Sequence, residues 1–302
     1  MNQKSLSEEI LRLKKEKDAV LLVHNYQRNE IQLLADHLGD SLGLSRIAAE
    51  AEQSRIVFCG VTFMAETAKI LSPDKTVLLP RLNAGCPMAE MADVSGLLAL
   101  KAEHPDAMIV SYVNSTAEVK AVTDVCCTSA NAVSVVRNVE SDEIIFAPDR
   151  NLASWVQRFT DKQIIPWDGY CYVHDRFTSD EVNAAREKHP DAVIVVHPEV
   201  PKEVADLADE VFSTSGMVRF ARESDARTIV LGTEAGMLDR LKRENPDKTF
   251  FSLGSAKMCR GMKVTRLEDL HQALVHNRHR IELDPDILRR ARGALERMLE
   301  YA

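Results

Sequence analysis

The sequence has no excess of basic residues, no apolar run long enough to span a membrane and no hydrophobic leader at its start. Its 302 residues include 38 Lys and Arg against 46 Asp and Glu, and the net charge of −8 argues against nucleic acid as the main partner. The polar opening MNQKSLSEEILRLKKEKDA lacks the apolar centre of a signal peptide. We therefore expect a cytoplasmic protein that binds neither nucleic acid nor membranes.

Disulfide frameworks and low-complexity linkers are also missing. The six cysteines occur without a secretory signal, so thiols or metal ligands are expected rather than structural disulfides. With 45% hydrophobic and 28% charged residues, the composition is that of an ordinary globular chain. Because no linker divides it, the sequence predicts one compact body.

The main positive feature is a segment that occurs three times. HPDAVIVVHPE at His189–Glu199 is close to HPDAMIVSYVN at His104–Asn114, which lies 85 residues earlier, and DAVLLVHNY at Asp18–Tyr26 is a third version. This period is far longer than a solenoid repeat, so each copy predicts a small α/β domain. The predicted domains are 1–103 with an N-terminal helix, 104–188, and 189–302 with C-terminal helices.

Each copy alternates short apolar segments with helical patterns. Near-continuous apolar runs bounded by turn-forming residues indicate parallel strands that are buried on both faces. Besides the three repeated segments, the predicted strands are 55–59, 76–79, 143–147, 163–165, 228–231 and 249–253. This order predicts right-handed βαβ units, hence three homologous small α/β/α domains with parallel sheets. We expect them in a pseudo-threefold arrangement with the active site at the centre.

Apolar residues at helical spacing also predict three equivalent helices, over 30–38, 119–125 and 204–211. An S-x-x-E capping signature places the start of the first helix at Ser5. The pair Asp284-Pro285 predicts the start of the last helix, with the aspartate as its cap.

One cysteine follows the last strand of each copy: Cys86, Cys171 and Cys259. Loops at the carboxyl ends of parallel strands are where α/β folds bind ligands, so a threefold arrangement would bring the three thiols to one point. Recurrence in register favours a metal or iron–sulfur site over three ordinary buried cysteines. The remaining cysteines recur at no corresponding position and are predicted to be core residues: Cys59, Cys126 and Cys127.

The number of thiols bears on the kind of metal site. A structural zinc usually has four ligands, often in close C-x-x-C pairs, which makes zinc the weaker interpretation. A [4Fe-4S] cluster held by three thiolates would leave one iron free to bind substrate and to act as a Lewis acid.

A hydroxyl residue stands at a helix start in each copy, at a similar distance after the first strand: Ser41, Ser129 and Thr214. Ser and Thr favour helix N-caps, where each contributes about 1 kcal/mol. Three converging helix N-termini would also attract an anionic ligand. The two interpretations are compatible, and we expect both.

Several short motifs, taken together, resemble the iron–sulfur quinolinate synthase family, type A. They are VHNYQ, GDSLGLS, SYVNS, CTSANA, FAPDRNL, the HPE turn, FSTSGM and the three single cysteines, and they cover nearly the whole chain. The resemblance implies condensation of iminoaspartate with dihydroxyacetone phosphate to quinolinate, with release of phosphate and two waters, in de novo NAD biosynthesis. It also implies that Cys86, Cys171 and Cys259 hold a [4Fe-4S] cluster whose fourth iron contacts substrate.

The resemblance further implies a substrate pocket lined by His24, Tyr26, Ser41, Tyr112, Asn114, Ser129, His197, Glu199 and Thr214. Elimination and ring closure require proton transfer, for which Glu199, Tyr26, Tyr112, His24 and His197 are suitable residue types. We expect functional coupling to an enzyme that produces the unstable iminoaspartate.

Two features set limits on the resemblance. Some members have a C-x-x-C pair at the last cysteine that is linked to redox control, whereas this chain reads Cys259-Arg260-Gly261-Met262, so such control is not expected. The histidines of the HPDA turns, His104 and His189, are expected to be structural.

Two other functions compete. An iron–sulfur hydro-lyase would also use a cluster with one open iron, and a non-catalytic cluster protein could sense oxygen or iron. The polar pocket residues favour an enzyme, because a sensor needs no anion pocket.

Overall fold

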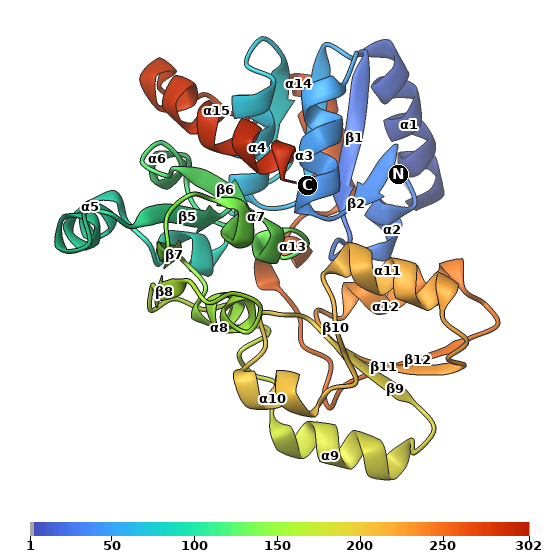
Figure 1. Ribbon diagram of the computed structural model, residues 1–302. Coiled ribbons are helices and arrows are strands. Elements are labelled where there is room, and N and C mark those ends of the chain that lie inside the picture. The colour runs from blue at the N-terminus through green and yellow to red at the C-terminus, as the bar shows by residue number, and fades with distance from the viewer. Residues whose placement is uncertain (1–2, 302) are drawn as a thin grey trace.

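The computed structural model describes residues 3–301, which form three four-stranded parallel sheets with helices on both sides (Figure 1). The strand orders are β2-β1-β3-β4, β6-β5-β7-β8 and β10-β9-β11-β12. In each sheet the first strand of the repeat is central and the next strand along the chain lies at the edge. The predicted fold class, three small α/β/α units, is confirmed. The residue boundaries between the units stay a prediction.

The elements of the first unit are α1 (Gln3–Glu16), β1 (Ala19–His24), α2 (Asn29–Gln32), β2 (His37–Gly39), α3 (Ser41–Glu50), β3 (Arg55–Cys59), α4 (Thr62–Leu71), β4 (Thr76–Leu78) and the 3-10 helix η1 (Pro87–Glu90). Helix α5 (Val94–Glu103) leads to the second unit, whose elements are β5 (Met108–Tyr112), α6 (Ala117–Lys120), β6 (Val125–Cys127), α7 (Ala132–Asn138), β7 (Glu143–Ala147), α8 (Arg150–Gln157) and β8 (Gln163–Pro166).

Helix α9 (Ser179–Lys188) leads to the third unit, whose elements are β9 (Val193–Val196), α10 (Lys202–Leu207), β10 (Glu210–Val211), α11 (Thr214–Glu223), β11 (Thr228–Gly232), α12 (Gly236–Glu244) and β12 (Thr249–Ser252). Three helices follow: α13 (Arg260–Lys263), α14 (Leu267–His276) and α15 (Pro285–Glu300). Within residues 3–301, no helix combines the length and the apolar character needed to cross a membrane.

The predicted strands are confirmed. They could be recognised because helices cover both faces of each sheet. All six residues of β1 are buried, and so are the last four of β3, β5, β7 and β11. A strand covered on both faces has no polar side, which is why these segments read as continuous apolar runs. The strands pair in parallel register, with Ala19 opposite Arg55 and Val23 opposite Cys59.

The prediction of helices over 30–38, 119–125 and 204–211 is wrong in its second half. Each helix is short, and the chain then forms an edge strand of two or three residues: β2, β6 and β10. An aspartate next to each edge strand anchors this turn, because its carboxylate accepts a hydrogen bond of 2.8 Å from a backbone N–H of the central strand. These bonds run from Leu21 to Asp36, from Ile109 to Asp124 and from Ile194 to Asp209.

The capping predictions for the first and last helices have opposite outcomes. Helix α1 already begins at Gln3, so Ser5 lies inside it and does not mark its start. Asp284 does cap α15, since its carboxylate accepts from the N–H groups of Asp286 and Ile287, and Pro285 occupies the first helical turn.

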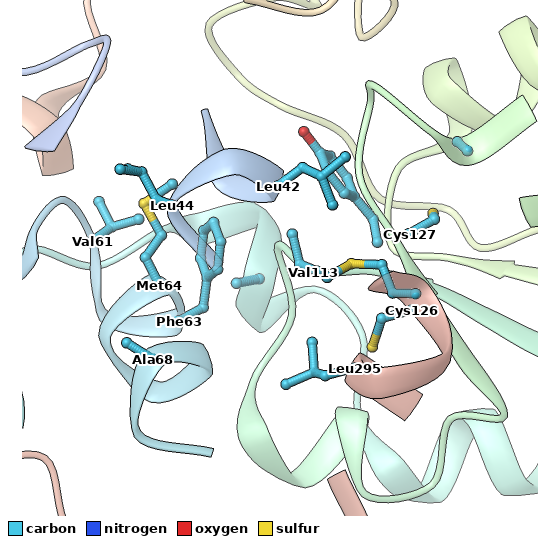
Figure 2. Packing of buried hydrophobic residues seen from close by; sticks show 14 of the residues in the cluster. Leu42, Leu44, Val61, Phe63, Met64, Ala68, Val113, Cys126, Cys127 and Leu295 are labelled. Atoms are coloured by element: carbon cyan, nitrogen blue, oxygen red, sulfur yellow. The ribbon is translucent and has the colours of Figure 1, made fainter. Parts of the chain in front are cut away.

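The helices that follow the third unit pack against the other two. Helix α14 lies on α1 and β3, whereas α15 lies on α4 of the first unit and on α6 and β6 of the second (Figure 1). The amide of Asn131 donates to the carbonyl of Met298 at 3.1 Å, and Leu295 points towards Cys126 (Figure 2). Helix α15 therefore joins the first two units.

Figure 2 also shows the core that the first two units share, in which Met64 of α4 lies beside Leu44 and Phe63 lies between Met64 and Val113 of the second unit. The three cysteines predicted to be core residues are fully buried: Cys59, Cys126 and Cys127.

Candidate functional site

One small cavity, of about 70 Å³, collects the polar residues that follow the strands of all three sheets. The twelve residues singled out in the sequence all line it: His24, Tyr26, Ser41, Cys86, Tyr112, Asn114, Ser129, Cys171, His197, Glu199, Thr214 and Cys259. Their positions in the cavity are an observation, whereas their roles stay predictions.

These twelve residues form four sets of three, because each repeat contributes one residue of each set. The sets are His24, Tyr112 and His197; Tyr26, Asn114 and Glu199; Ser41, Ser129 and Thr214; Cys86, Cys171 and Cys259. The first and second sets sit at and just beyond the ends of β1, β5 and β9. The second set has three different side chains and the first has a tyrosine beside two histidines, so the cavity is asymmetric although its three lining segments are equivalent.

The hydroxyl set does not cap helices, which corrects the expectation from the sequence. Asp40 caps α3 by accepting from the N–H of Gly43 at 2.8 Å, and Ser213 caps α11 by accepting from Gly216. Ser41 and Thr214 are the first residues inside these helices, one position after the cap. Both residues line the cavity, and the Asn25 amide donates to the Thr214 hydroxyl at 2.9 Å.

Ser129 lies in the turn before α7, whose N-cap residue is Asn131. Thr128 supplies the local hydrogen bonds of this turn, since its hydroxyl donates to Asn131 and accepts from the N–H of Ala130. Ser129 is thus also free of a capping role and lines the cavity.

His24 and His197 are held in the same way. The Nδ1 atom of each accepts from the backbone N–H two residues further on, Tyr26 at 3.1 Å and Glu199 at 3.3 Å. A neutral imidazole that accepts at Nδ1 carries its proton on Nε2, so both rings have Nε2–H as their donor. Burial lowers the pKa of each histidine to about 3, which keeps both neutral at physiological pH.

Glu199 lies in a cluster of hydrogen-bond donors. Nδ1 of His174 lies 2.6 Å from its carboxylate, whereas Nδ1 of His197, 3.8 Å away, accepts from the Glu199 N–H and donates nothing to the carboxylate. The Glu199 side chain is almost fully buried. Burial alone would raise the pKa of Glu199, but His197, His174 and a hydrogen bond from Tyr112 outweigh it and hold the pKa well below its usual value. The carboxylate is therefore ionised and fixed in place.

His174 was not found from the sequence. Besides Glu199, it contacts Thr233 through Nε2 at 2.9 Å and stacks on His197 with ring centroids 4.5 Å apart. The equivalent positions in the other repeats are Ala89 and Met262, so no repetition marked it. Its only sequence signal is the C-x-x-H spacing from Cys171.

The two tyrosines of the cavity are buried phenols. Burial raises the pKa of Tyr26 and of Tyr112 well above the usual value, and the nearby charge of Glu199 adds to the effect. The hydroxyl of Tyr26 bonds to that of Thr233 at 2.7 Å. Both phenols stay protonated at neutral pH and so can donate hydrogen bonds to an anion.

Asn114 presents an open acceptor. Its Oδ1 atom is buried and has no hydrogen-bond partner among residues 3–301. Because a buried polar atom without a partner is costly, a ligand that donates a hydrogen bond here would be favoured. The cavity therefore suits a small polar molecule that carries both anionic groups and donors.

Two sets of residues could hold a metal. The first is the set of three cysteines, whose thiols all line the cavity and whose pKa values burial raises, that of Cys86 to about 12. The second comprises Cys171, His174 and Glu199, whose ligand atoms lie within 4.8 Å of one another. Both sets use Cys171, so they exclude each other as full sites.

The histidines of the HPDA turns lie outside the cavity. His104 forms an ion pair of 2.9 Å with Glu143 when it is protonated, and His189 stacks on Phe251 at 4.2 Å. Their structural interpretation agrees with these contacts.

Comparison with known proteins gives a consistent result. A family model described as "Quinolinate synthetase A protein" matches residues 8–300. Curated relatives named quinolinate synthase include proteins of Methanoregula boonei and Thermodesulfovibrio yellowstonii, each 53% identical over 97% of both chains. A third, of Geotalea uraniireducens, is 52% identical over 99% of this chain and 98% of its own.

Proposed function

This chain belongs to the quinolinate synthetase A family, and we propose that it condenses iminoaspartate with dihydroxyacetone phosphate to quinolinate. The reaction releases one phosphate and two waters, needs no external oxidant or reductant, and supplies the pyridine ring for de novo NAD biosynthesis. The observation that carries the proposal is the single cavity lined by four sets of repeat-equivalent residues.

The proposed cofactor is a [4Fe-4S] cluster held by Cys86, Cys171 and Cys259. Three half-buried cysteines from equivalent positions at one cavity support it, because such clusters are held by cysteine thiolates. When bound, the cluster supplies a Lewis-acidic iron that polarises an oxygen atom of the substrate. A single metal ion on Cys171, His174 and Glu199 would leave Cys86 and Cys259 without a role, so the cluster is favoured.

Anionic groups of the substrates are proposed to bind the hydroxyl set. Ser41 and Thr214 open the ten-residue helices α3 and α11, where the partial positive charge of the helix adds to the hydroxyl donor. Ser129 contributes the third hydroxyl from the second repeat. Iminoaspartate carries two carboxylates and dihydroxyacetone phosphate one phosphate, which matches a pocket with several separate donors.

Proton transfer is proposed to centre on Glu199. Its carboxylate is ionised and hydrogen-bonded to Tyr112, so it can accept a proton, and its lowered pKa means that it passes the proton on readily. Tyr112 and Tyr26 are protonated phenols that can orient a leaving oxygen and donate to it. His24 and His197 are neutral and donate from Nε2, which suits them to positioning rather than to charge neutralisation.

The decisive experiment supplies both substrates to anaerobically purified protein and measures quinolinate by mass spectrometry. Iminoaspartate is unstable, so it should be generated in the assay by an aspartate-oxidising enzyme that is supplied with an electron acceptor other than oxygen. This arrangement also reflects the functional coupling we propose. Quinolinate should form only when both substrates are present. Protein that contains iron and sulfide in full amount but forms none would overturn the proposal.

The same protein distinguishes the competing functions. A hydro-lyase would dehydrate small hydroxy acids without dihydroxyacetone phosphate, and a sensor would do neither reaction. Acid-labile sulfide distinguishes a cluster from a single ion, since only the cluster contains it.

A further inference from the structure

Two buried carboxylates occupy equivalent positions beside the cysteine loops. Asp149 follows the end of β7 by two residues, and Glu234 follows the end of β11 by two residues. Their exposed fractions are 0% and 1%. Neither carboxylate was predicted from the sequence to be a site residue. The equivalent residue after β3 is Val61, so the first repeat has no carboxylate here.

The backbone around these positions is the same in all three repeats. The residue after each of them donates its N–H to the carbonyl of the residue two places before the cysteine. These bonds run from Thr62 to Ala84 at 2.8 Å, from Arg150 to Gly169 at 2.8 Å and from Ala235 to Lys257 at 2.9 Å. One backbone hydrogen bond thus fixes the approach to Cys86, Cys171 and Cys259 alike, and the carboxylates add to it in two repeats only.

Glu234 binds its cysteine loop directly. One oxygen accepts from the backbone N–H of Cys259 at 3.0 Å, and the other accepts from the N–H of Gly236 at 2.6 Å. Lys263 lies 3.1 Å from the carboxylate and compensates its charge. Because Lys263 also donates to the carbonyl of Tyr26, this network connects the cysteine to the first repeat.

Asp149 makes a related arrangement at Cys171. One oxygen accepts from the N–H of Leu152 at 2.8 Å as the cap of α8, and the carboxylate faces the backbone N–H of Cys171. The other oxygen, Oδ2, is buried and has no hydrogen-bond partner among residues 3–301. A capping aspartate does not need full burial, so its place against the cysteine loop calls for a second role.

We propose that Asp149 and Glu234 are positioning residues that fix Cys171 and Cys259 for the iron–sulfur cluster, while Cys86 is fixed by the backbone alone. The inference rests on the proposed cofactor. Groups that orient metal ligands without touching the metal typically change metal affinity about 10–100-fold when they are removed. The cluster is therefore bound unequally, with two ligands held by side chains and one held less firmly.

The test compares leucine and amide variants at both positions. Asp149→Leu and Glu234→Leu keep the approximate volume but lose the acceptors, and reconstituted protein should lose iron to a chelator roughly tenfold faster or more. Asp149→Asn keeps the Leu152 bond but replaces the second oxygen by an NH2 donor, so its iron loss should fall between that of the parent and that of Asp149→Leu. Glu234→Gln keeps only one of two acceptors and should fall between the parent and Glu234→Leu.

A matched control is Glu66→Leu. Glu66 is also largely buried and accepts a backbone N–H, that of Ala117 at 3.1 Å, but its partners are Ala117 and Lys120 rather than the backbone of a cysteine loop. This variant should lower the thermal stability while iron is retained at the parent rate. Should the leucine variants at Asp149 and Glu234 fail to fold, Glu234→Asp gives a milder comparison, because it withdraws the carboxylate from Cys259 by one methylene.

The outcomes separate this inference from the proposed cofactor. Parent protein that takes up no iron and sulfide under anaerobic reconstitution would overturn the cofactor itself. A loaded parent whose leucine variants, or Glu234→Asp in their place, release iron at the parent rate would overturn only the positioning role.

Discussion

The Nδ1 atom of His174 lies 2.6 Å from a carboxylate oxygen of Glu199, and both side chains are shielded from solvent. One residue precedes the third sheet and the other follows its first strand, so the contact forms only in the folded protein. It keeps the carboxylate ionised in a place where burial alone would favour the neutral acid. Such a group is suited to proton transfer, and its role can be tested by single substitutions.

Glu199→Gln should lower turnover by about 10²–10⁴, the range typical of a lost general acid or base. Glutamine keeps the size and one acceptor for His174, so iron content and affinity for quinolinate should stay near the parent values. Anaerobic steady-state kinetics and equilibrium binding measure the two effects separately. A rate within a few-fold of the parent would assign the proton carrier elsewhere, with Tyr26, His24 and His197 as the next candidates.

Removal of single cysteines should divide them into two classes. Alanine at Cys86, Cys171 or Cys259 should abolish or strongly reduce iron, sulfide and the visible absorption under anaerobic conditions. The control is alanine at a core position such as Cys126, which should cost about 1 kcal/mol of stability but leave the cluster in place. A full cluster in Cys171→Ala would contradict the assignment.

Ser41→Ala and Ser129→Ala should weaken quinolinate binding roughly tenfold or more, because a hydrogen bond to a charged group contributes about 1.5–3 kcal/mol. Since neither hydroxyl caps a helix, the melting temperature should change little. Ser213→Ala provides the opposite case, as it removes the cap of α11 and should lower stability by about 1 kcal/mol. Binding that is unchanged in both pocket variants would leave the hydroxyls without a role in recognition.

The buried neutral histidines should make the protein sensitive to acid. His24 has a pKa of about 3 in the folded state and 6.5 as a reference, so the unfolded chain binds more protons between these values. Stability therefore falls as the pH falls from about 6.5 towards 3, by about 2 kcal/mol per histidine between pH 7 and 5. Lys263, His197, Glu199 and Arg240 act on the same ring, but burial is the main cause.

Urea unfolding of the parent and of His24→Gln at pH 7 and pH 5 checks this prediction. The loss of stability on acidification should be about 2 kcal/mol smaller in His24→Gln than in the parent. Equal losses would mean that His24 is protonated in the folded protein as readily as in the unfolded chain.

The strands and the cavity residues could be predicted from the sequence because both repeat. A fully buried strand leaves a continuous apolar run, and a residue needed at the same point in three repeats is found three times. The edge strands were missed, because two or three residues form them and Val119, Val122 and Val125 mimic helical spacing. The signal that was present is the aspartate before each of them, Asp36 in the first repeat and its counterparts in the others.

Residues that occur once could not be found in this way. No histidine stands at the position equivalent to His174 in the other repeats. Glu234 is matched by a carboxylate only in the second repeat, as Asp149, whereas the first repeat has a valine at this position. Their importance depends on which backbone N–H or side chain they meet across the units, and that depends on tertiary packing. The prediction that Ser41 and Thr214 cap helices was wrong for a local reason. The residue before each of them, Asp40 or Ser213, is an equally good N-cap and caps the helix instead.

Helix α15 is the last element to be synthesised, although it packs against the first two units. It follows the third unit along the chain, yet its residues Ala291, Ala294, Leu295 and Met298 fill the core between α4 of the first unit and β6 of the second. On the ribosome, the first two units are therefore synthesised long before the helix that packs against both of them. Until then the apolar surface that the first two units share has to stay covered by other means.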